Sequence, residues 1–246
     1  QGVPGPEDVA IDRSRGIAYI SAYDRRLASS DDPGASGVRG GIYVMDLNAD
    51  AAGLFLRPIT PLMPEAFRPH GISLFTAADG TRTLMAVNHP GGDDHTVEIF
   101  DLSDDDVLTH RRTVRDPLIM SPNDVAAVSP EAFYVTNDHD RPGQDGRTLA
   151  ALFASPITTV VYHDGSASQV VADELALANG VAVSGDRSKV YVTELLARKL
   201  HIFDRDPSTG GLTLSDQVFL GTGVDNIDVA EDGALWIGAH PQLATF

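Results

Sequence analysis

The chain has 246 residues, of which 42% are hydrophobic, with 23 glycines, 15 prolines and no cysteine. Its 35 acidic residues against 18 basic ones leave a formal net charge of −17, which repels phosphate backbones and argues against a nucleic-acid partner. The lack of cysteine excludes disulfides, thiolate nucleophiles and cysteine-type zinc sites.

Length and hydropathy predict a single soluble domain over residues 1–246. Many all-β domains reach this length, and the frequent glycines and prolines are typical of short strands joined by tight turns. No apolar run is long enough to cross a membrane, and the sequence starts at Gln1 without a signal peptide or an amphipathic anchor. We expect no membrane anchor in this chain and the earlier removal of a preceding segment. A secreted or periplasmic location is preferred, and the oligomeric state stays open.

Short runs of β-branched and aromatic residues, bounded by Gly, Asp, Asn and Pro, predict strands along the whole chain. Helical periodicity is confined to short stretches such as 173–177, so we expect an all-β fold. Residues 24–40 have no strand pattern and are expected to form a mobile loop, either covering a site or simply disordered. The predicted strands cover residues 16–21, 41–46, 83–87, 97–102, 132–136, 159–163, 189–193, 199–204 and 234–238.

One module occurs five times: a polar residue or pair, a short apolar strand and, shortly afterwards, a second strand of the Tyr-Val-Thr kind. The openings follow one another at intervals of 46 to 63 residues, the size of a four-stranded propeller blade with its loops. In a propeller the first strand of each blade lines the central channel, so we expect the residues that open these strands to meet at one mouth of it. The openings lie at 7–11, 70–74, 123–126, 179–183 and 225–229, and the second strands at 18–21, 85–88, 133–136, 190–193 and 235–238.

Five side chains at these openings carry hard oxygen donors. Together they offer two carboxylates and three amides without sulfur or imidazole, a set that suits Ca²⁺ and disfavours zinc. Such an ion could polarise a substrate or only stabilise the fold, and each polar pair taken alone is also an ordinary turn. Asp8 and Asp124 follow two of these donors and point the other way by strand alternation, so they could form a second, deeper oxygen site. The five donors are Glu7, Asn123, Asn179, Asp225 and Asn226.

Two histidines supply a different chemistry at the same mouth. His70 opens the second module where the others place an oxygen donor, and His89 ends the following strand. Each imidazole alone is more typical of a surface or core residue, but together they suggest a base and its orienting partner. We find no Gly-x-Ser-x-Gly elbow, His-Glu-x-x-His helix, Walker loop or Gly-x-Gly-x-x-Gly turn, so serine-hydrolase chemistry has no support.

These segments, taken in order, resemble the paraoxonase (arylesterase/lactonase) family. The resemblance extends from about residue 5 to residue 241 and is specific as an ordered set. It rests on 6–8 (PED), 69–73 (PHGIS), 87–90 (VNHP), 123–124 (ND), 133–139 (FYVTNDH), 178–180 (ANG), 194–197 (ELLA), 224–227 (VDNI) and 235–241 (LWIGAHP).

The resemblance implies a six-bladed β-propeller that holds two calcium ions and hydrolyses lactones, aryl esters and sometimes organophosphate triesters. Calcium would polarise the carbonyl while His70, oriented by His89, activates a water; Asp225 or Glu7 could share the role of base. His240 would line the substrate pocket. The catalytic calcium would be held by Glu7, Asn123, Asn179, Asp225 and Asn226, and the structural one by Asp8, Asp124 and the carbonyl of Ile72.

Three departures from the family pattern bear on these expectations. The paired cysteines and the N-terminal hydrophobic helix of the family are absent, so neither its disulfide nor its lipoprotein anchoring is carried over. Five modules are visible, so we expect the sixth blade to be incomplete or truncated. Two alternatives stay open: a sugar lactonase of the gluconolactonase/regucalcin type, and a non-catalytic propeller scaffold with structural calcium.

Overall fold

The computed structural model describes residues 3, 5–28, 38–50, 54–63, 66–92, 94–140 and 155–241, which form eighteen strands and one helical turn. The chain divides into two units, residues 1–114 and 115–246. Within the described ranges, no helix is long and apolar enough to cross a membrane.

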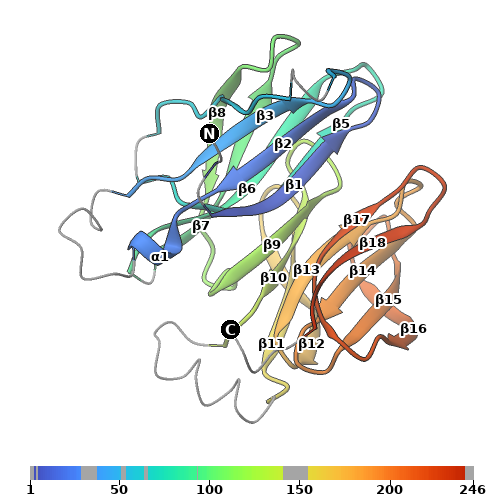
Figure 1. Cartoon of the computed structure of the whole chain (residues 1–246). Coiled ribbons are helices and arrows are strands. Elements are labelled where there is room, and N and C mark those ends of the chain that lie inside the picture. Colours follow the sequence, from blue (N-terminus) through green and yellow to red (C-terminus); the bar gives the residue numbers. More distant parts are fainter. Residues whose placement is uncertain are drawn as a thin grey trace. The chain divides into compact units, whose positions relative to one another are not determined.

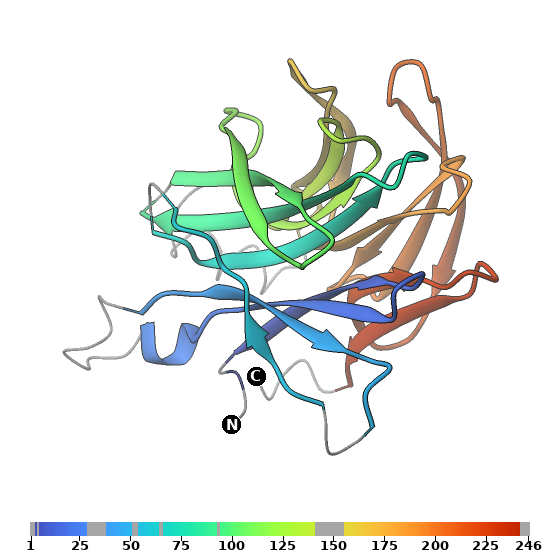
Figure 2. The same ribbon diagram turned by 90° about the horizontal axis from the view of Figure 1, so that it is seen from above.

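The first unit holds two four-stranded antiparallel sheets, each with its strands in chain order (Figure 1). One sheet comprises β1 (Pro6–Asp12), β2 (Ile17–Ala22), β3 (Gly41–Asp46) and β4 (Arg57–Pro58), and the helical turn α1 (Arg25–Ala28) follows β2. The other comprises β5 (Pro69–Thr76), β6 (Arg82–Gly91), β7 (Asp94–Leu102) and β8 (Leu108–Val114). The first strands of the two sheets, β1 and β5, lie against each other (Figure 2).

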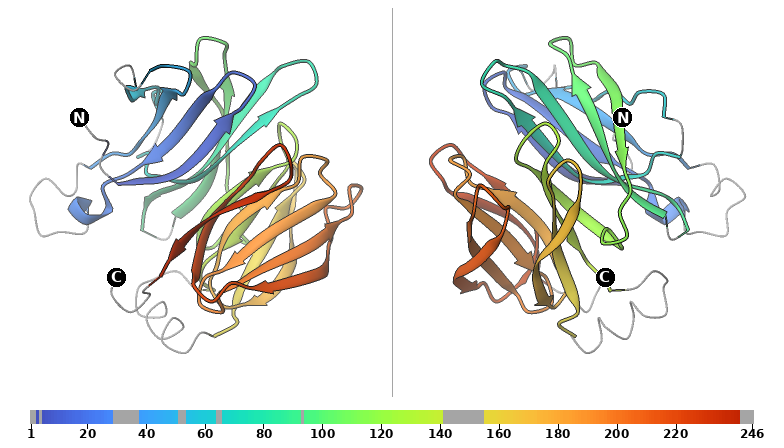
Figure 3. Two further views of the ribbon diagram at one scale, coloured as in Figure 1. Left: turned by 45° about the vertical axis from the view of Figure 1, so that its right-hand side comes forward. Right: turned by 180° about the vertical axis from the view of Figure 1, so that it is seen from behind.

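The second unit holds two further four-stranded sheets and a two-stranded one. Their first strands are again neighbours, because β13 contacts both β9 and β17 (Figure 3). The sheets comprise β9 (Pro122–Ala127), β10 (Phe133–Asn137), β11 (Thr158–His163) and β12 (Ser168–Leu175); β13 (Ala178–Val183), β14 (Lys189–Glu194), β15 (Lys199–Arg205) and β16 (Leu212–Phe219); and β17 (Gly223–Val229) with β18 (Leu235–His240).

Successive four-stranded antiparallel meanders are the blades of a β-propeller, so the all-β propeller prediction is confirmed at the level of the fold. The five predicted openings lie in β1, β5, β9, β13 and β17, and the predicted second strands lie in β2, β6, β10, β14 and β18. The described residues form four four-stranded blades and one two-stranded sheet; a count of six blades stays a prediction.

Two stretches differ in detail from their sequence patterns. Residues 173–177 are not helical, because strand β12 extends to Leu175. The loop predicted at 24–40 begins with the turn α1, in which the Asp24 carboxylate accepts a hydrogen bond from the Leu27 amide (2.9 Å) as an N-cap does. Residues 29–37 of that loop lie outside the described residues.

Each unit has its own hydrophobic core. In the first, Tyr19 and Ile42 pack with Leu84 and Phe100, all with no exposed surface. The second core is richer in valine and includes Tyr134, Val160, Val181, Val190 and Phe203. The second strands β2 and β10 are buried along their whole length, which explains why both begin with apolar residues that do not alternate with polar ones, IAYI and FYV.

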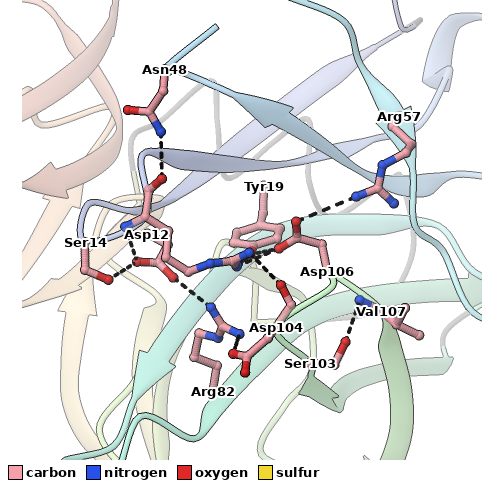
Figure 4. Close-up of polar contacts among 11 residues, drawn as sticks. Asp12, Ser14, Tyr19, Asn48, Arg57, Arg82, Ser103, Asp104, Asp106 and Val107 are labelled. Atoms are coloured by element: carbon pink, nitrogen blue, oxygen red, sulfur yellow. Dashed lines mark hydrogen bonds and ion pairs between the residues drawn. The ribbon is translucent and has the colours of Figure 1, made fainter.

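A charged cluster joins the two sheets of the first unit at the β1–β2 and β7–β8 turns (Figure 4). The Asp106 carboxylate accepts hydrogen bonds from Arg15 (2.7 Å) and from the Tyr19 hydroxyl (2.6 Å), and it lies 3.6 Å from Arg57. Burial alone would raise the pKa of Asp106, but the hydrogen bonds of Arg15 and Tyr19 and the charges of Arg15 and Arg57 lower it. The ionised carboxylate therefore stabilises this contact.

We expect Asp106→Asn to lower the free energy of unfolding by about 1–3 kcal/mol at pH 7, because charged hydrogen bonds become neutral ones. Asparagine tolerates the positive φ of 56° at this position. Because the pKa of Asp106 is lowered in the folded state, its contribution is present above the unfolded value of about 4 and is lost as the pH falls through the folded value. Urea unfolding of both proteins between pH 7 and pH 3 tests this; a difference that does not shrink toward pH 3 would contradict it.

Candidate active site

Each of the five first strands carries a β-bulge at its predicted polar pair. Two residues of the first strand lie opposite one residue of the second: between the pairs Pro6–Ala22 and Val9–Ile20, residues 7 and 8 face Ser21. A bulge bends the strand and redirects side chains, and bulges are frequent next to active sites. The same pairing sets 70–71 against 87, 123–124 against 136, 179–180 against 193, and 225–226 against 238.

Opposite three of these bulges, a hydroxyl side chain accepts a hydrogen bond from a backbone amide that makes no regular cross-strand hydrogen bond. In each case the amide of the second bulge residue donates to a serine or threonine on the neighbouring strand, so the bulge is held without an unsatisfied buried N–H. The pairs are Asp8 with Ser21 (3.1 Å), Asp124 with Thr136 (3.1 Å) and Gly180 with Thr193 (2.7 Å).

Asp8 and Asp124 link successive first strands in the same way. One oxygen of each carboxylate accepts a hydrogen bond from the amide of the next residue (2.8 Å). The other oxygen accepts from the following blade: Ile72 donates to Asp8 (2.7 Å), and Val181 donates to Asp124 (2.8 Å). Asp8 and Ile72, two members of the predicted structural-calcium set, are thus neighbours. Because Asp8 and Asp124 lie in bulges, the strict alternation of side chains along a strand does not apply to them.

The second unit gathers four of the predicted oxygen donors on the neighbouring strands β9, β13 and β17. Asn123 and Asn179 are each 6% exposed, and their buried Oδ1 atoms accept no hydrogen bond from the described residues. The Oδ1 atom of Asn226 is also shielded from water, and Asp225 precedes it in the same bulge. Buried oxygens normally have partners, so these two amide oxygens, which accept no hydrogen bond from the described residues, are candidate ligands of a cation.

Close packing of backbone brings β17 to β13. An ideal Cβ on Gly180 would lie 2.6 Å from the Asp225 carbonyl oxygen and 2.8 Å from the Asn226 Cα, so only glycine fits. The Thr193 hydroxyl donates to the same Asp225 carbonyl (2.7 Å). His240 Nε2 lies 2.5 Å from Asp225 Oδ2, which places the predicted substrate-binding histidine against a predicted metal ligand.

The first unit brings Glu7, His70 and His89 together; Glu7 and His70 open their modules, and His89 lies at the end of the strand that follows His70. Glu7 Oε1 is 2.8 Å from His70 Nε2, and His70 Nδ1 is 3.1 Å from His89 Nε2. Burial by itself would raise the pKa of Glu7, but the electrostatic attraction and hydrogen bond of His70, together with Arg25 at 3.6 Å, lower it. The Glu7 carboxylate is therefore ionised, with one oxygen on His70 and its Oε2 atom shielded from water.

A third histidine extends this chain and was missed at the sequence level. His95 Nδ1 lies 2.8 Å from His89 Nδ1, across the hairpin in which Asn88 pairs with Thr96. This contact could have been predicted from the sequence. Strands are predicted at 83–87 and 97–102 with Gly91-Gly92 between them, and a hairpin centred there brings residue 89 close to residue 95.

The donor set fits calcium by chemistry. In the described part of the chain, no group of three or more His, Cys, Asp or Glu side chains is arranged to hold a metal. The predicted set does not require one, since three of its five oxygens come from asparagine and Ca²⁺ readily accepts amide oxygens. Glu7 lies in the first unit and the other four donors in the second, so their convergence stays a prediction.

Comparisons with known proteins agree on one family. The profile of the Arylesterase family matches residues 31–246. The chain is 36% identical over 243 residues to serum paraoxonase/arylesterase 1 of Homo sapiens and 37% identical over 245 residues to serum paraoxonase/arylesterase 2 of Bos taurus. Each alignment covers 97% of this chain and 67% of the relative.

Solved structures share the fold at low sequence identity. Regucalcin from Agrobacterium tumefaciens, a calcium-binding protein, has a TM-score of 0.56 at 15% identity, covering 97% of this chain and 68% of that one. The periplasmic gluconolactonase of Pseudomonas aeruginosa has a TM-score of 0.58 at 13% identity, covering 96% and 65%.

Proposed function

Because the chain belongs to the paraoxonase/arylesterase family, we propose that it is a calcium-dependent hydrolase of lactones and aryl esters. The observation that carries the metal dependence is the pair of buried Asn123 and Asn179 oxygens, which accept no hydrogen bond from the described residues. Organophosphate triesters are a further proposed substrate class.

We propose that Asn123, Asn179, Asp225 and Asn226 hold the catalytic calcium in the second unit, with Glu7 as the fifth ligand. Two carboxylates balance the charge of a dication and three amides add neutral oxygens. Bound there, calcium would supply the positive charge that polarises the scissile carbonyl and stabilises its developing oxyanion. Asp8, Asp124 and the Ile72 carbonyl are the proposed ligands of a second, structural calcium.

We propose that the Glu7–His70 pair acts as the general base and accepts the proton of the attacking water. His70 Nε2 and Glu7 Oε1 are 2.8 Å apart, so a proton taken up by either group is shared across one hydrogen bond. His89 orients the His70 ring through Nδ1, and His240, against Asp225, is the proposed pocket residue. Full lactonase activity in a His70→Gln variant would remove His70 from this role.

We also propose that both units belong to one propeller domain over residues 1–246, with six blades. In that arrangement β17 and β18 are the first two strands of the fifth blade. The regular recurrence of the five bulged first strands along the chain, and the propeller fold of the structural neighbours, support this assignment.

Calcium removal tests the proposed function. We expect turnover of phenyl acetate and of γ- and δ-lactones by the calcium-loaded protein, loss of activity of at least about 100-fold with excess chelator, and recovery on adding calcium, because the oxyanion loses its counter-charge. Turnover of gluconolactone alone would favour a sugar lactonase. If the calcium-loaded protein hydrolyses no lactone or ester, it is a binding scaffold and the proposal fails.

A further inference from the structure

Three histidines of the first unit form a continuous hydrogen-bonded chain that ends on Glu7. Starting from the carboxylate, Glu7 Oε1 to His70 Nε2 is 2.8 Å, His70 Nδ1 to His89 Nε2 is 3.1 Å, and His89 Nδ1 to His95 Nδ1 is 2.8 Å. The rings are tilted, with interplanar angles of 59° and 83°, so their contacts are made through nitrogen rather than by stacking.

The carboxylate at one end gives this chain a direction. An ionised carboxylate only accepts hydrogen bonds, and a neutral imidazole carries one N–H and one acceptor nitrogen. With neutral rings, His70 therefore donates from Nε2 to Glu7 and accepts at Nδ1. His89 must then donate from Nε2 and accept at Nδ1, which requires His95 to donate from Nδ1.

The reverse direction is unfavourable at the Glu7 end. If His89 carried its proton on Nδ1, its Nε2 lone pair would face His70, and His70 would have to move its own proton to Nδ1. The His70 Nε2 lone pair would then point at the Glu7 carboxylate, so a buried charged hydrogen bond would be lost, which costs about 1–3 kcal/mol or more.

Burial is greatest at the Glu7 end of the histidine chain. His70 is 9% exposed, whereas His89 and His95 are partly buried. His95 lies at the start of β7, and the β6–β7 register is irregular between Asn88 and Gly91. The hairpin thereby sets the two imidazoles at hydrogen-bond distance although neither forms a regular cross-strand pair.

We propose that His95 is a positioning residue for the hydrolytic reaction: its Nδ1–H donates to His89 Nδ1, which supports the tautomer set by Glu7, holds the His89 ring in place and, through His89, fixes the His70 ring toward Glu7. The role rests on the proposed function, because His70 and Glu7 handle the proton of the attacking water there. Second partners that fix a tautomer commonly contribute 10–100-fold to activity, and His95 does so without touching substrate.

Three variants separate this role from simple packing. His95→Leu removes the donor and is expected to lower kcat for phenyl acetate about tenfold or more while KM changes less than about twofold, since ground-state binding is untouched. His95→Asn keeps a side-chain N–H near the Nδ1 position and is expected to restore kcat to within about threefold of the parent. His95→Asp offers only acceptors and is expected to be as impaired as His95→Leu.

The decisive readout is the ring-nitrogen ¹⁵N NMR spectrum of the calcium-loaded full chain, which reports the tautomers of His70 and His89 without any turnover. We expect Nε2–H on both residues in the parent, in His95→Asn and in His95→Leu, because Glu7 sets that direction. In His95→Leu the ¹⁵N resonance of His89 Nδ1 is expected to move toward that of an imidazole nitrogen that accepts no hydrogen bond, and in His95→Asn to stay near its parent position. A parent His89 protonated on Nδ1, or a His89 Nδ1 resonance that His95→Leu leaves unchanged, would overturn the inference. Failure of the proposed function is a separate result: a parent without esterase and lactonase activity whose His89 Nδ1 resonance still responds to residue 95.

Discussion

Asn179→Ala is expected to weaken calcium binding about 10- to 100-fold and to lower kcat/KM for lactones at least as much, while leaving the metal-free protein as stable as the parent. The Asn179 Oδ1 atom is buried and accepts no hydrogen bond from the described residues. Removing it deletes a polar atom that stabilises nothing in the absence of the ion. At fixed saturating calcium, a 100-fold weaker site lowers the free energy of unfolding by about 2.7 kcal/mol.

Asn137→Ala is the matched control within the same unit. Asn137 is fully buried as well, but its amide accepts from the Met120 and Ser121 amides (3.0 and 3.1 Å) and donates to the Leu118 carbonyl and the Thr159 hydroxyl (2.8 and 3.0 Å). It should destabilise the metal-free protein by about 2–4 kcal/mol and leave calcium affinity nearly unchanged. Urea unfolding with and without calcium, combined with calorimetric titration, compares the two. Equal losses of metal-free stability in both variants, with calcium affinity intact, would exclude Asn179 as a ligand.

Gly180→Ala is expected to destabilise the protein by about 1–3 kcal/mol and to weaken calcium binding at the same time. The added Cβ would meet the Asp225 carbonyl oxygen at 2.6 Å and the Asn226 Cα at 2.8 Å. Both are backbone atoms that cannot swing aside, so β17 must move away from β13 and take two proposed ligands with it. The Thr193 hydrogen bond to Asp225 would be lost with that movement.

Gly185→Ala is the appropriate control for this change. Gly185 is exposed in the turn after β13, and a Cβ there would meet no atom within 4 Å. It should change stability by less than about 0.5 kcal/mol. Thermal unfolding and calcium titration of both variants provide the comparison; calcium affinity that survives in Gly180→Ala would show that β17 and β13 can separate without disturbing the site.

The positions of the proposed site residues were predictable because the chain repeats itself. Five polar openings in one register predicted five first strands, and each lies where the repeat put it, down to the pairs 123–124 and 225–226. Residues in the same place of each repeat share the same backbone environment. The His70–His89 contact followed from the same logic. His70 lies near the start of the first strand of its blade and His89 near the end of the second, and antiparallel pairing brings these two ends together.

What the repeat could not predict was the local geometry at those positions. Period-two alternation predicted that Asp8 and Asp124 point away from Glu7 and Asn123, whereas a bulge interrupts the strand pairing at every opening. The bulge depends on a hydroxyl of another strand, such as Thr136 or Thr193. Its partners are separated by at least a dozen residues, so no local pattern specifies it.

The sequence by itself therefore determined the all-β blade repeat, the oxygen-rich donor set and the candidate histidine pair, because these follow from residue type and spacing. Only the tertiary structure decided that the Asn123 and Asn179 oxygens are buried without a hydrogen bond from the described residues, that Asp8 and Asp124 link successive blades, and that His95 extends the chain from Glu7. Hydrogen-bond satisfaction and direction are properties of atoms brought together by packing, and spacing along the chain does not specify them.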